Sequence, residues 1–438
     1  MAIGAGLLVS GLSSYVFLKL LRAGIGSDAA TEPVNQLWFL VFLLAPGFFL
    51  PVEQEVGRAL AHRRALGQGG GPVVRRAGML ALGLAGITTV GMLAAGPVLV
   101  SKLFAGNWVL MIWLVIAFLG WASSHLARGV LSGSGRFGPY GLLLAADGIL
   151  RVGIAIVFKI ADVHSPAIWG VAVAVPPIFA VLLAIRGQGG LLVDGPQAEW
   201  GELTPNLGWL VAGSVLAAVL VNGGPVVAGV LKTKSQADLV SHFTYAVIIT
   251  RVPLFLFQAV QAALLPKLAQ LAARGALVEF RQGFRKLVLV VLVVGTLGVA
   301  GSAVLGQWAV KLFSPTADLS RRTVVLLALA SALYMLALSM AQAVIALHGH
   351  ATVAIGWAVA VAVFIGVTTL AGHDLLLRVE LGLVFGSLAG SLAFAWTYLR
   401  LVHRRTVAAG AGAGAATGTE LPMPDPATLI APLPYGER

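Results

Sequence analysis

The stretch SHFTYAVIITRVPLFLFQAVQAALLPKLA, residues 241–269, decides the fold because it is too apolar to be anything but a membrane segment, yet it carries Arg251. On insertion scales, an arginine near the bilayer centre costs roughly 2.5–3.5 kcal/mol. Such a residue persists only if it faces protein or a water-filled cavity and meets an anion there. We therefore expect Arg251 to mark a functional site.

A second ionisable pair lies in GLLLAADGILRVGIAIVF, residues 141–158, where Asp147 and Arg151 are four positions apart. This spacing puts both on one helix face, so they can neutralise each other in the resting protein. In a functional interpretation, Arg151 swings to a phosphate of the cargo while Asp147 holds it or takes a proton. Asp147 is then the candidate for coupling to a proton or sodium ion. Two intramembrane arginines indicate a transporter with an anionic cargo.

The composition excludes a soluble chain. Of 438 residues, 58% are hydrophobic and 11% are charged, whereas globular chains have about a quarter charged. We therefore predict an all-α integral membrane protein. The formal charge of +12 reflects arginine gathered on one side of a membrane, so no nucleic acid is expected as a partner. The chain has no Cys, and its eight His form no ligand-spaced cluster, so we expect neither a metal site nor a cofactor.

Apolar runs of about 20 residues mark the membrane-spanning helices. No basic region precedes the first run, so we interpret it as an uncleaved span rather than a signal peptide. Lys and Arg gather in the connections after the even-numbered spans, which places both termini in the cytoplasm. The twelve predicted spans are 2–21, 35–57, 77–100, 107–128, 138–159, 166–186, 206–231, 240–266, 285–307, 322–346, 351–372 and 380–401.

Two basic connections resemble each other. One is EVGRALAHRRALGQGGGPVVRRAGMLAL after the second span, and the other is LPKLAQLAARGALVEFRQGFRKLVLVVL after the eighth. Repeats of the same orientation predict two parallel six-helix lobes related by an axis along the membrane normal. We predict lobes at 1–186 and 205–404, a Gly-rich cytoplasmic linker at 187–204 and a disordered cytoplasmic tail at 405–438.

A family resemblance rests mainly on the stretch from Tyr245 to Phe313. Here Arg251 and Pro253 are followed by LLPKLAQLAARG, then FRQGFRKLVLVV opening the next span, then a closing KLF. The stretch RGVLSGSGRFGPYGLLLAADGILR at 128–151 adds a second pattern. Together they resemble the MOP exporter superfamily, which includes MATE-like transporters, and particularly its lipid-linked oligosaccharide flippases. The resemblance covers residues 1–404.

The resemblance implies two lobes in a V around a central cavity, in a bacterial cytoplasmic membrane. It also implies a non-enzymatic carrier that flips an undecaprenyl-pyrophosphate-linked oligosaccharide by alternating access. In the lipid II flippases an arginine before a proline in the eighth span lines the cavity, and Arg251 with Pro253 matches that position. Those flippases typically have fourteen spans, whereas apolar runs here end near residue 401. Their arginines in the first two spans have no intramembrane counterpart, because Arg22 and Arg58 fall at span ends.

Two interpretations of Arg251 stay open. As a ligand, its guanidinium offers a planar fork of donors to pyrophosphate oxygens. As a structural cation, it bonds to backbone carbonyls that Pro253 leaves free. Polar side chains on the seventh and eighth spans either join helices or line a cavity that accepts sugar. They are Asn222, His242, Tyr245, Gln258 and Gln261.

Charged residues at the predicted cytoplasmic ends of spans have simpler expected roles. We expect Glu53 and Glu55 to form interfacial pairs beside Arg58. We expect Arg128 and Arg136 to contact anionic lipid headgroups.

Three classes of function can be compared with these sequence features. The first is the flippase, whose partners are a lipid-linked saccharide, membrane lipids and a coupling ion. A MATE-type multidrug cation exporter would need intramembrane carboxylates, of which only Asp147 fits. A membrane glycosyltransferase or polymerase would need carboxylates at the membrane face and a large outer loop, but every predicted outer loop is short. A scaffold derived from a flippase, without transport, is also compatible with the sequence.

Overall fold

The computed structural model describes residues 2–203, 207–254, 257, 271, 274, 276–347 and 349–417. The first half of the chain forms eight helices, two of which, α7 and α8, together make one span. They are α1 (Ala2–Ile25), α2 (Asp28–Ala65), α3 (Gly71–Ala94), α4 (Gly96–Lys102), α5 (Trp108–Gly133), α6 (Phe137–Ile160), α7 (Pro166–Ala174) and α8 (Pro176–Ile185).

The second half follows a short 3₁₀ turn, η1 (Trp200–Glu202), and contains a second such turn, η2 (Lys234–Gln236). Its helices are α9 (Leu207–Leu231), α10 (Ala237–Ile249), α12 (Leu277–Lys311), α13 (Arg321–Ala346), α14 (His350–Leu370) and α15 (Leu375–Thr417). The last helix runs past residue 404, where the last predicted lobe ends.

The predicted all-α membrane fold is confirmed. Within the described ranges, 11 helices are long and apolar enough to cross a membrane. The remaining predicted span, 240–266, coincides with α10 at its start, and much of its second half lies outside the described residues. The lobe, linker and tail boundaries stay predictions.

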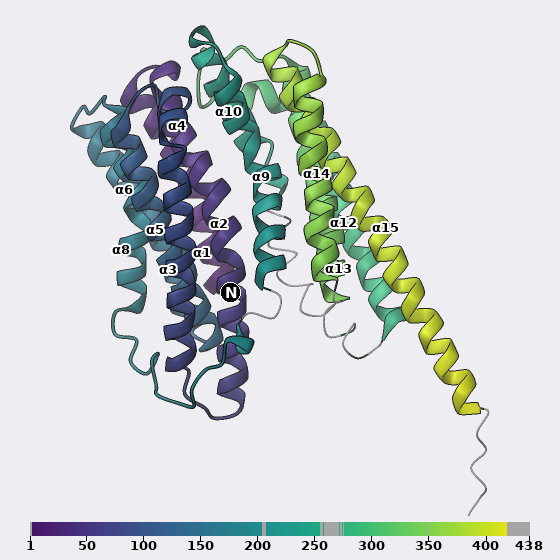
Figure 1. The fold of residues 1–438 in the computed structure, drawn as a ribbon. Helices are drawn as coiled ribbons and strands as arrows, with labels where there is room; N and C mark the ends of the chain where they lie inside the picture. The colour runs from purple at the N-terminus through teal and green to yellow at the C-terminus, as the bar shows by residue number, and fades with distance from the viewer. Residues whose placement is uncertain are drawn as a thin grey trace, which may run out of the picture.

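The helices form two groups that share one seam. In the first group α1 packs on α6 and α2 on α5; in the second, α15 packs on α13 and α14, and α12 packs on α13. The seam consists of α2 against α9 and α10. Figure 1 shows the groups close together around α10 and diverging toward the opposite end, where α15 points away.

Small residues allow the tightest of these packings. A Cβ atom built on Gly6 of α1 or on Gly141 of α6 would lie 2.4 Å from a backbone oxygen of the other helix. Glycine lets the two backbones approach, which is how helices associate where no hydrophobic force drives them together. The α1–α6 pair therefore forms a firm edge of the first group.

The predicted orientation can be checked with fusions. Alkaline phosphatase fused after Gly69, in the basic turn between α2 and α3, should be inactive because this turn is expected in the cytoplasm. A fusion after Ala317, between α12 and α13, should be active. Phosphatase activity at the Gly69 fusion would reverse the orientation, and reporter expression should be matched by immunoblot.

Candidate functional site

Arg251 lies directly after the end of α10, where the backbone makes a turn before Pro253. Its Nη1 donates a hydrogen bond to Oδ1 of Asn222 on α9, at 3.0 Å. Its guanidinium also lies over the ring of Phe39 on α2, 5.5 Å from the centroid. Arg251 is partly buried and touches both groups of helices at the seam; among the described residues, Asn222 is the hydrogen-bond partner of its guanidinium.

Asn222 has a second bond that fixes its orientation. Its Nδ2 donates to the backbone carbonyl of Phe42 on α2, at 3.0 Å. That carbonyl is free because Pro46, four residues later inside α2, has no N–H to offer it. The Asn222 amide therefore satisfies α2 with its nitrogen, which leaves its oxygen to accept from Arg251.

The surroundings of Arg251 are aromatic rather than acidic. Tyr15 of α1 and Tyr334 of α13 are close enough to interact electrostatically with the guanidinium. In the described part of the chain, no Asp or Glu forms an ion pair with Arg251. The structure bears on both interpretations of Arg251. Among the described residues, its side chain forms no hydrogen bond to a carbonyl freed by Pro253, and its hydrogen-bond partner is the amide of Asn222.

A polar cluster that the sequence analysis missed joins the two groups at the α10 end of the seam. Asp28, in the first turn of α2, accepts through Oδ2 from Ser314 at 2.6 Å and from Thr316 at 2.9 Å. The same oxygen lies 3.0 Å from Nε2 of His242 on α10. Oδ1 of Asp28 pairs with Arg22 of α1. We call these five residues the Asp28 cluster.

The next turns of α2 extend the contact along the seam. Thr31 Oγ1 lies 3.3 Å from the hydroxyls of both Ser241 and Tyr245. Tyr245, a predicted binding residue, is fully buried there and stacks on Phe313, so it belongs to the seam near the Asp28 cluster. One signal could have identified this face: the polar residues of DAATEPVNQ at the start of an otherwise apolar span.

Further polar pairs occupy the same face of α2. Glu32 forms an ion pair with Lys232. Gln36 Nε2 donates to the carbonyl of Pro225 at 3.0 Å, and Asn35 Nδ2 donates to Ser241 Oγ at 3.2 Å. One side-chain oxygen each of Glu32, Asn35 and Gln36 is buried without a described hydrogen-bond partner. The part of the seam nearest the Asp28 cluster is therefore closed by polar contacts, although some side-chain oxygens there have no described hydrogen-bond partner.

The structure brings Asp147 and Arg151 together as the spacing predicts. Nη2 of Arg151 lies 3.0 Å and 2.9 Å from the two carboxylate oxygens of Asp147, and both residues are buried. The guanidinium also lies over the ring of Trp38 on α2, at 4.6 Å. Its Nε and Nη1 have no described hydrogen-bond partner. The geometry matches the self-neutralising interpretation, and the transport role stays a prediction.

A double replacement tests whether this pair acts as a unit. Arg151→Gln alone should leave a buried carboxylate without its cation and reduce folding yield or transport severely, on the order of 3–5 kcal/mol for a broken buried pair. Replacing Asp147 by Asn at the same time should be milder. Membrane yield and thermal stability of single and double variants measure this. A double variant as damaged as Arg151→Gln would show that the two side chains are not partners.

Two other predicted binding residues, Gln258 and Gln261, lie outside the described residues. Within the described ranges, no three His, Asp or Glu side chains are grouped so that they could hold a metal ion.

The expectation that Glu53 pairs with Arg58 at the interface is wrong. Glu53, a residue of α2, is 7% exposed and faces α5 and α6. Its Oε2 is 2.7 Å from Nδ1 of His125 and 3.1 Å from Nη2 of Arg128, and its Oε1 accepts from Tyr140 at 2.7 Å. Arg128, expected at lipid headgroups, is therefore a buried partner of Glu53. Only Glu55 pairs with Arg58, at 2.6 Å.

The linker between the groups is fastened to the first one. Arg63 of α2 donates to both carboxylate oxygens of Glu202 at 2.8 Å and to the carbonyls of Pro196 and Gln197. This hydrogen bonding lowers the pKa of Glu202 below its usual value. Since the carboxylate stays charged at neutral pH, the linker is held on the end of the first group away from the Asp28 cluster.

Comparisons with known proteins identify the fold. No protein-family model and no curated protein matches the chain. The chain is similar to a solved multidrug resistance MATE family transporter of the MOP superfamily in its inward-facing conformation, with 15% identity, a TM-score of 0.69, and 92% of this chain and 98% of that chain covered. The outward-facing conformation of such a transporter matches with 15% identity, a TM-score of 0.66, and coverage of 91% and 94%.

A third similar structure is a MATE protein in a bent conformation, with 15% identity, a TM-score of 0.67, and coverage of 93% and 95%. At these identities the likeness establishes the architecture alone. The chain thus has the MATE-like fold seen in those MOP transporters, as the resemblance implied.

Proposed function

We propose that the chain is a non-enzymatic transporter that flips a lipid-linked oligosaccharide, carried on undecaprenyl pyrophosphate, from the inner to the outer leaflet. One observation carries the proposal: Arg251 stands at the seam of the two groups with a neutral amide partner and no described carboxylate. A cation in that position has no counter-ion among the described residues. A pyrophosphate supplies one, and guanidinium geometry suits its oxygens.

The arrangement of the seam supports alternating access as the mechanism. Described hydrogen bonds between the two groups begin at Asp28 and continue along α2 as far as Pro46, whose carbonyl accepts from Ser214 at 3.3 Å. Farther along α2, the described partners of Glu53 and Arg63 all belong to the first group or to the linker. Breaking the first set while closing the opposite end would expose Arg251 to the other side of the membrane.

The charge of Arg251 would guide the movement of the anionic cargo. At the cytoplasmic side, the pyrophosphate would reach Arg251 while the Asp28 cluster keeps the outer end closed. The free donors of the guanidinium would bind phosphate oxygens, and Asn222 would hold the guanidinium in place. When the outer end opens, the same contact would present the phosphate to the outer leaflet. The Asp147–Arg151 pair, buried in the first group, is the proposed coupling element.

Multidrug export is the second candidate, because the similar solved structures include multidrug transporters. A cationic cargo would need a carboxylate without a cation near the seam. The described buried carboxylates of the helices each have a basic partner instead; the pairs are Asp28–Arg22, Glu32–Lys232, Glu53–Arg128, Asp147–Arg151 and, at 3.8 Å, Glu380–Arg322. This charge arrangement favours an anionic cargo.

The sidedness of lipid-linked saccharide tests the proposal. Depleting the chain from its own cells should trap the saccharide at the inner leaflet, where a membrane-impermeant hydrolase added outside cannot reach it. Restoring the chain should make it accessible again. Susceptibility to cationic drugs serves as the control and should not change. Unchanged sidedness together with increased drug sensitivity would reject the flippase and support the exporter.

A further inference from the structure

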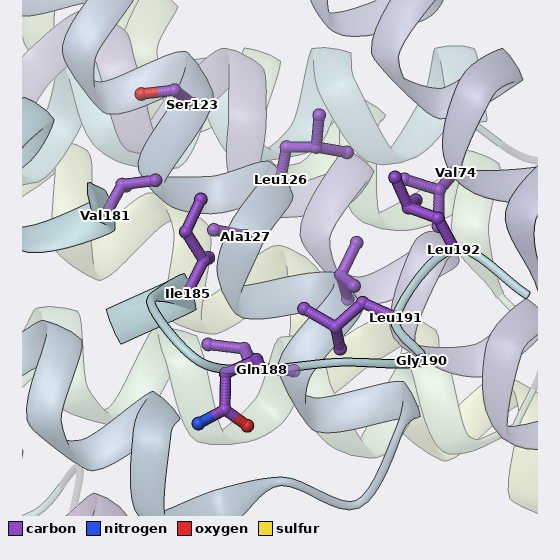
Figure 2. Close-up of a pocket in the computed structure, with 12 residues that line it drawn as sticks. Val74, Ser123, Leu126, Ala127, Val181, Ile185, Gln188, Gly190, Leu191 and Leu192 are labelled. Carbon is purple, nitrogen blue, oxygen red and sulfur yellow. The ribbon is translucent and has the colours of Figure 1, made fainter. Parts of the chain in front are cut away.

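A groove lies on the surface of the first group of helices. Residues of α5 form its floor, with Val74 of α3 on one side and Val181 and Ile185 of α8 on the other. Residues 188–192 of the linker close one end, as Figure 2 shows. The groove has a volume of about 550 Å³ and is lined almost entirely by aliphatic side chains.

The groove has the depth of one membrane leaflet. It extends from the linker to Ser123, an exposed residue of α5, whose last residue is Gly133. At 1.5 Å per residue, Ser123 lies about 15 Å along the helix from that end, which is about half the hydrocarbon thickness of a bilayer. An acyl chain entering from the headgroup level would therefore fit along the groove.

The linker end of the groove is basic. Nη1 of Arg136 donates to Oε1 of Gln188, a lining residue, at 3.0 Å, and its Nη2 donates to the carbonyl of Gly189. Arg186 follows Ile185 at the end of α8 and is exposed. Two acidic residues of the linker already have cations: Asp194 pairs with Arg75 at 3.4 Å and Glu202 with Arg63 at 2.8 Å. The rim thus presents two arginines whose charge no described carboxylate balances.

The linker itself has the character of a membrane-inserted loop. Leu192 and Val193 are 60% and 54% exposed, although they lie in a connection between helices. The backbone is nevertheless held in place: the amide of Gly71 donates to the carbonyl of Val193 at 2.8 Å. Exposed aliphatic side chains beside arginines are typical of segments that lie at the headgroup boundary of a membrane.

We propose that this groove binds an anionic phospholipid of the adjacent leaflet, with one acyl chain along α5 and its phosphate at Arg136 and Arg186. Aliphatic walls alone would accept any lipid. The arginines at the linker end select a lipid with net negative charge, because each basic side chain near an anionic headgroup strengthens binding about fivefold. The site is separate from Arg251 and does not depend on the cargo.

Site-specific quenching tests the proposal, since the absence of Cys makes single labels straightforward. Ser123→Cys carries a fluorophore in the groove. Val359→Cys on α14, 44% exposed and about nine residues from the start of its helix, is a control at similar depth. The full chain is reconstituted with phosphatidylglycerol or phosphatidylcholine bearing brominated acyl chains. We expect phosphatidylglycerol to quench the Ser123→Cys label at severalfold lower mole fraction, and both lipids to quench the control alike.

Charge removal completes the test. Arg136→Gln with Arg186→Gln should abolish the preference for phosphatidylglycerol at the groove, a loss of about fivefold for each arginine. Arg136 also holds the linker, so its replacement could disturb the structure. Arg186 has no described polar side-chain contact, so Arg186→Gln alone is a second variant. It should remove about half of the preference for phosphatidylglycerol on a logarithmic scale. Equal preference at both labels, or a preference unchanged in Arg186→Gln, would overturn the proposal.

Discussion

Arg251→Ala should abolish transport of the lipid-linked saccharide while the protein still inserts and folds. The substitution removes a partly buried charge, which relieves an insertion cost, and it leaves Asn222 bonded to the Phe42 carbonyl. What disappears is the cation at the seam. Arg251→Lys should retain partial transport, because a positive charge remains but the planar fork of donors is lost.

The measurement is accumulation of lipid-linked saccharide at the inner leaflet, at matched protein levels. Arg321→Ala, at the exposed start of α13, is the matched control and should behave like the wild type. A fully active Arg251→Ala protein would remove the main reason for an anionic cargo. If the alanine protein fails to accumulate in the membrane, Arg251 is a folding element at the turn before Pro253.

Asp28→Asn should open the outer end of the seam. The charged carboxylate accepts from Ser314, Thr316 and Arg22 and contacts His242, and hydrogen bonds to a charged group contribute about 1.5–3 kcal/mol each. Weakening even one of them would shift the balance between closed and open states by roughly tenfold or more. Transport should fall because the carrier spends less time open to the cytoplasm.

A disulfide reports this change directly. Thr31→Cys and Ser241→Cys replace hydroxyls 3.3 Å apart across the seam, so the pair should cross-link readily under oxidation and block transport until it is reduced. Adding Asp28→Asn should lower the cross-linking yield severalfold. Asp318→Asn, an exposed carboxylate in the loop that also carries Ser314, is the control. Equal yields in the Asp28 and Asp318 variants would show that the Asp28 cluster does not hold the seam closed.

The membrane fold could be predicted from sequence because apolar runs and their lengths are local properties. Asp147 and Arg151 are four residues apart on one helix, so their contact could also be predicted. Arg251 and Asn222 were both singled out, but their bond depends on how α9 approaches the end of α10, which spacing does not encode. The pairing therefore appears only in the structure.

The wrong expectation for Glu53 and the omission of Asp28 share one cause. Asp28 begins α2 and Glu53 lies near the end of the predicted second span, where charged residues ordinarily face water or headgroups. Glu53 has Arg58 nearby in sequence, yet its partners are His125 and Arg128 of α5. Helix packing buries these carboxylates, and a single sequence gives no measure of which end residues become buried.

The carbonyl of Phe42 has a consequence for the medium inside the transporter. Pro46 leaves this oxygen without a helical partner, and Asn222 of the opposite group satisfies it only while the seam is closed. An unsatisfied carbonyl in hydrocarbon costs several kcal/mol, so a dry separation of α2 from α9 is prohibitive. In the proposed transport cycle, hydration must therefore accompany the parting of the helices, and water must reach the depth of Phe42 whenever α2 separates from α9.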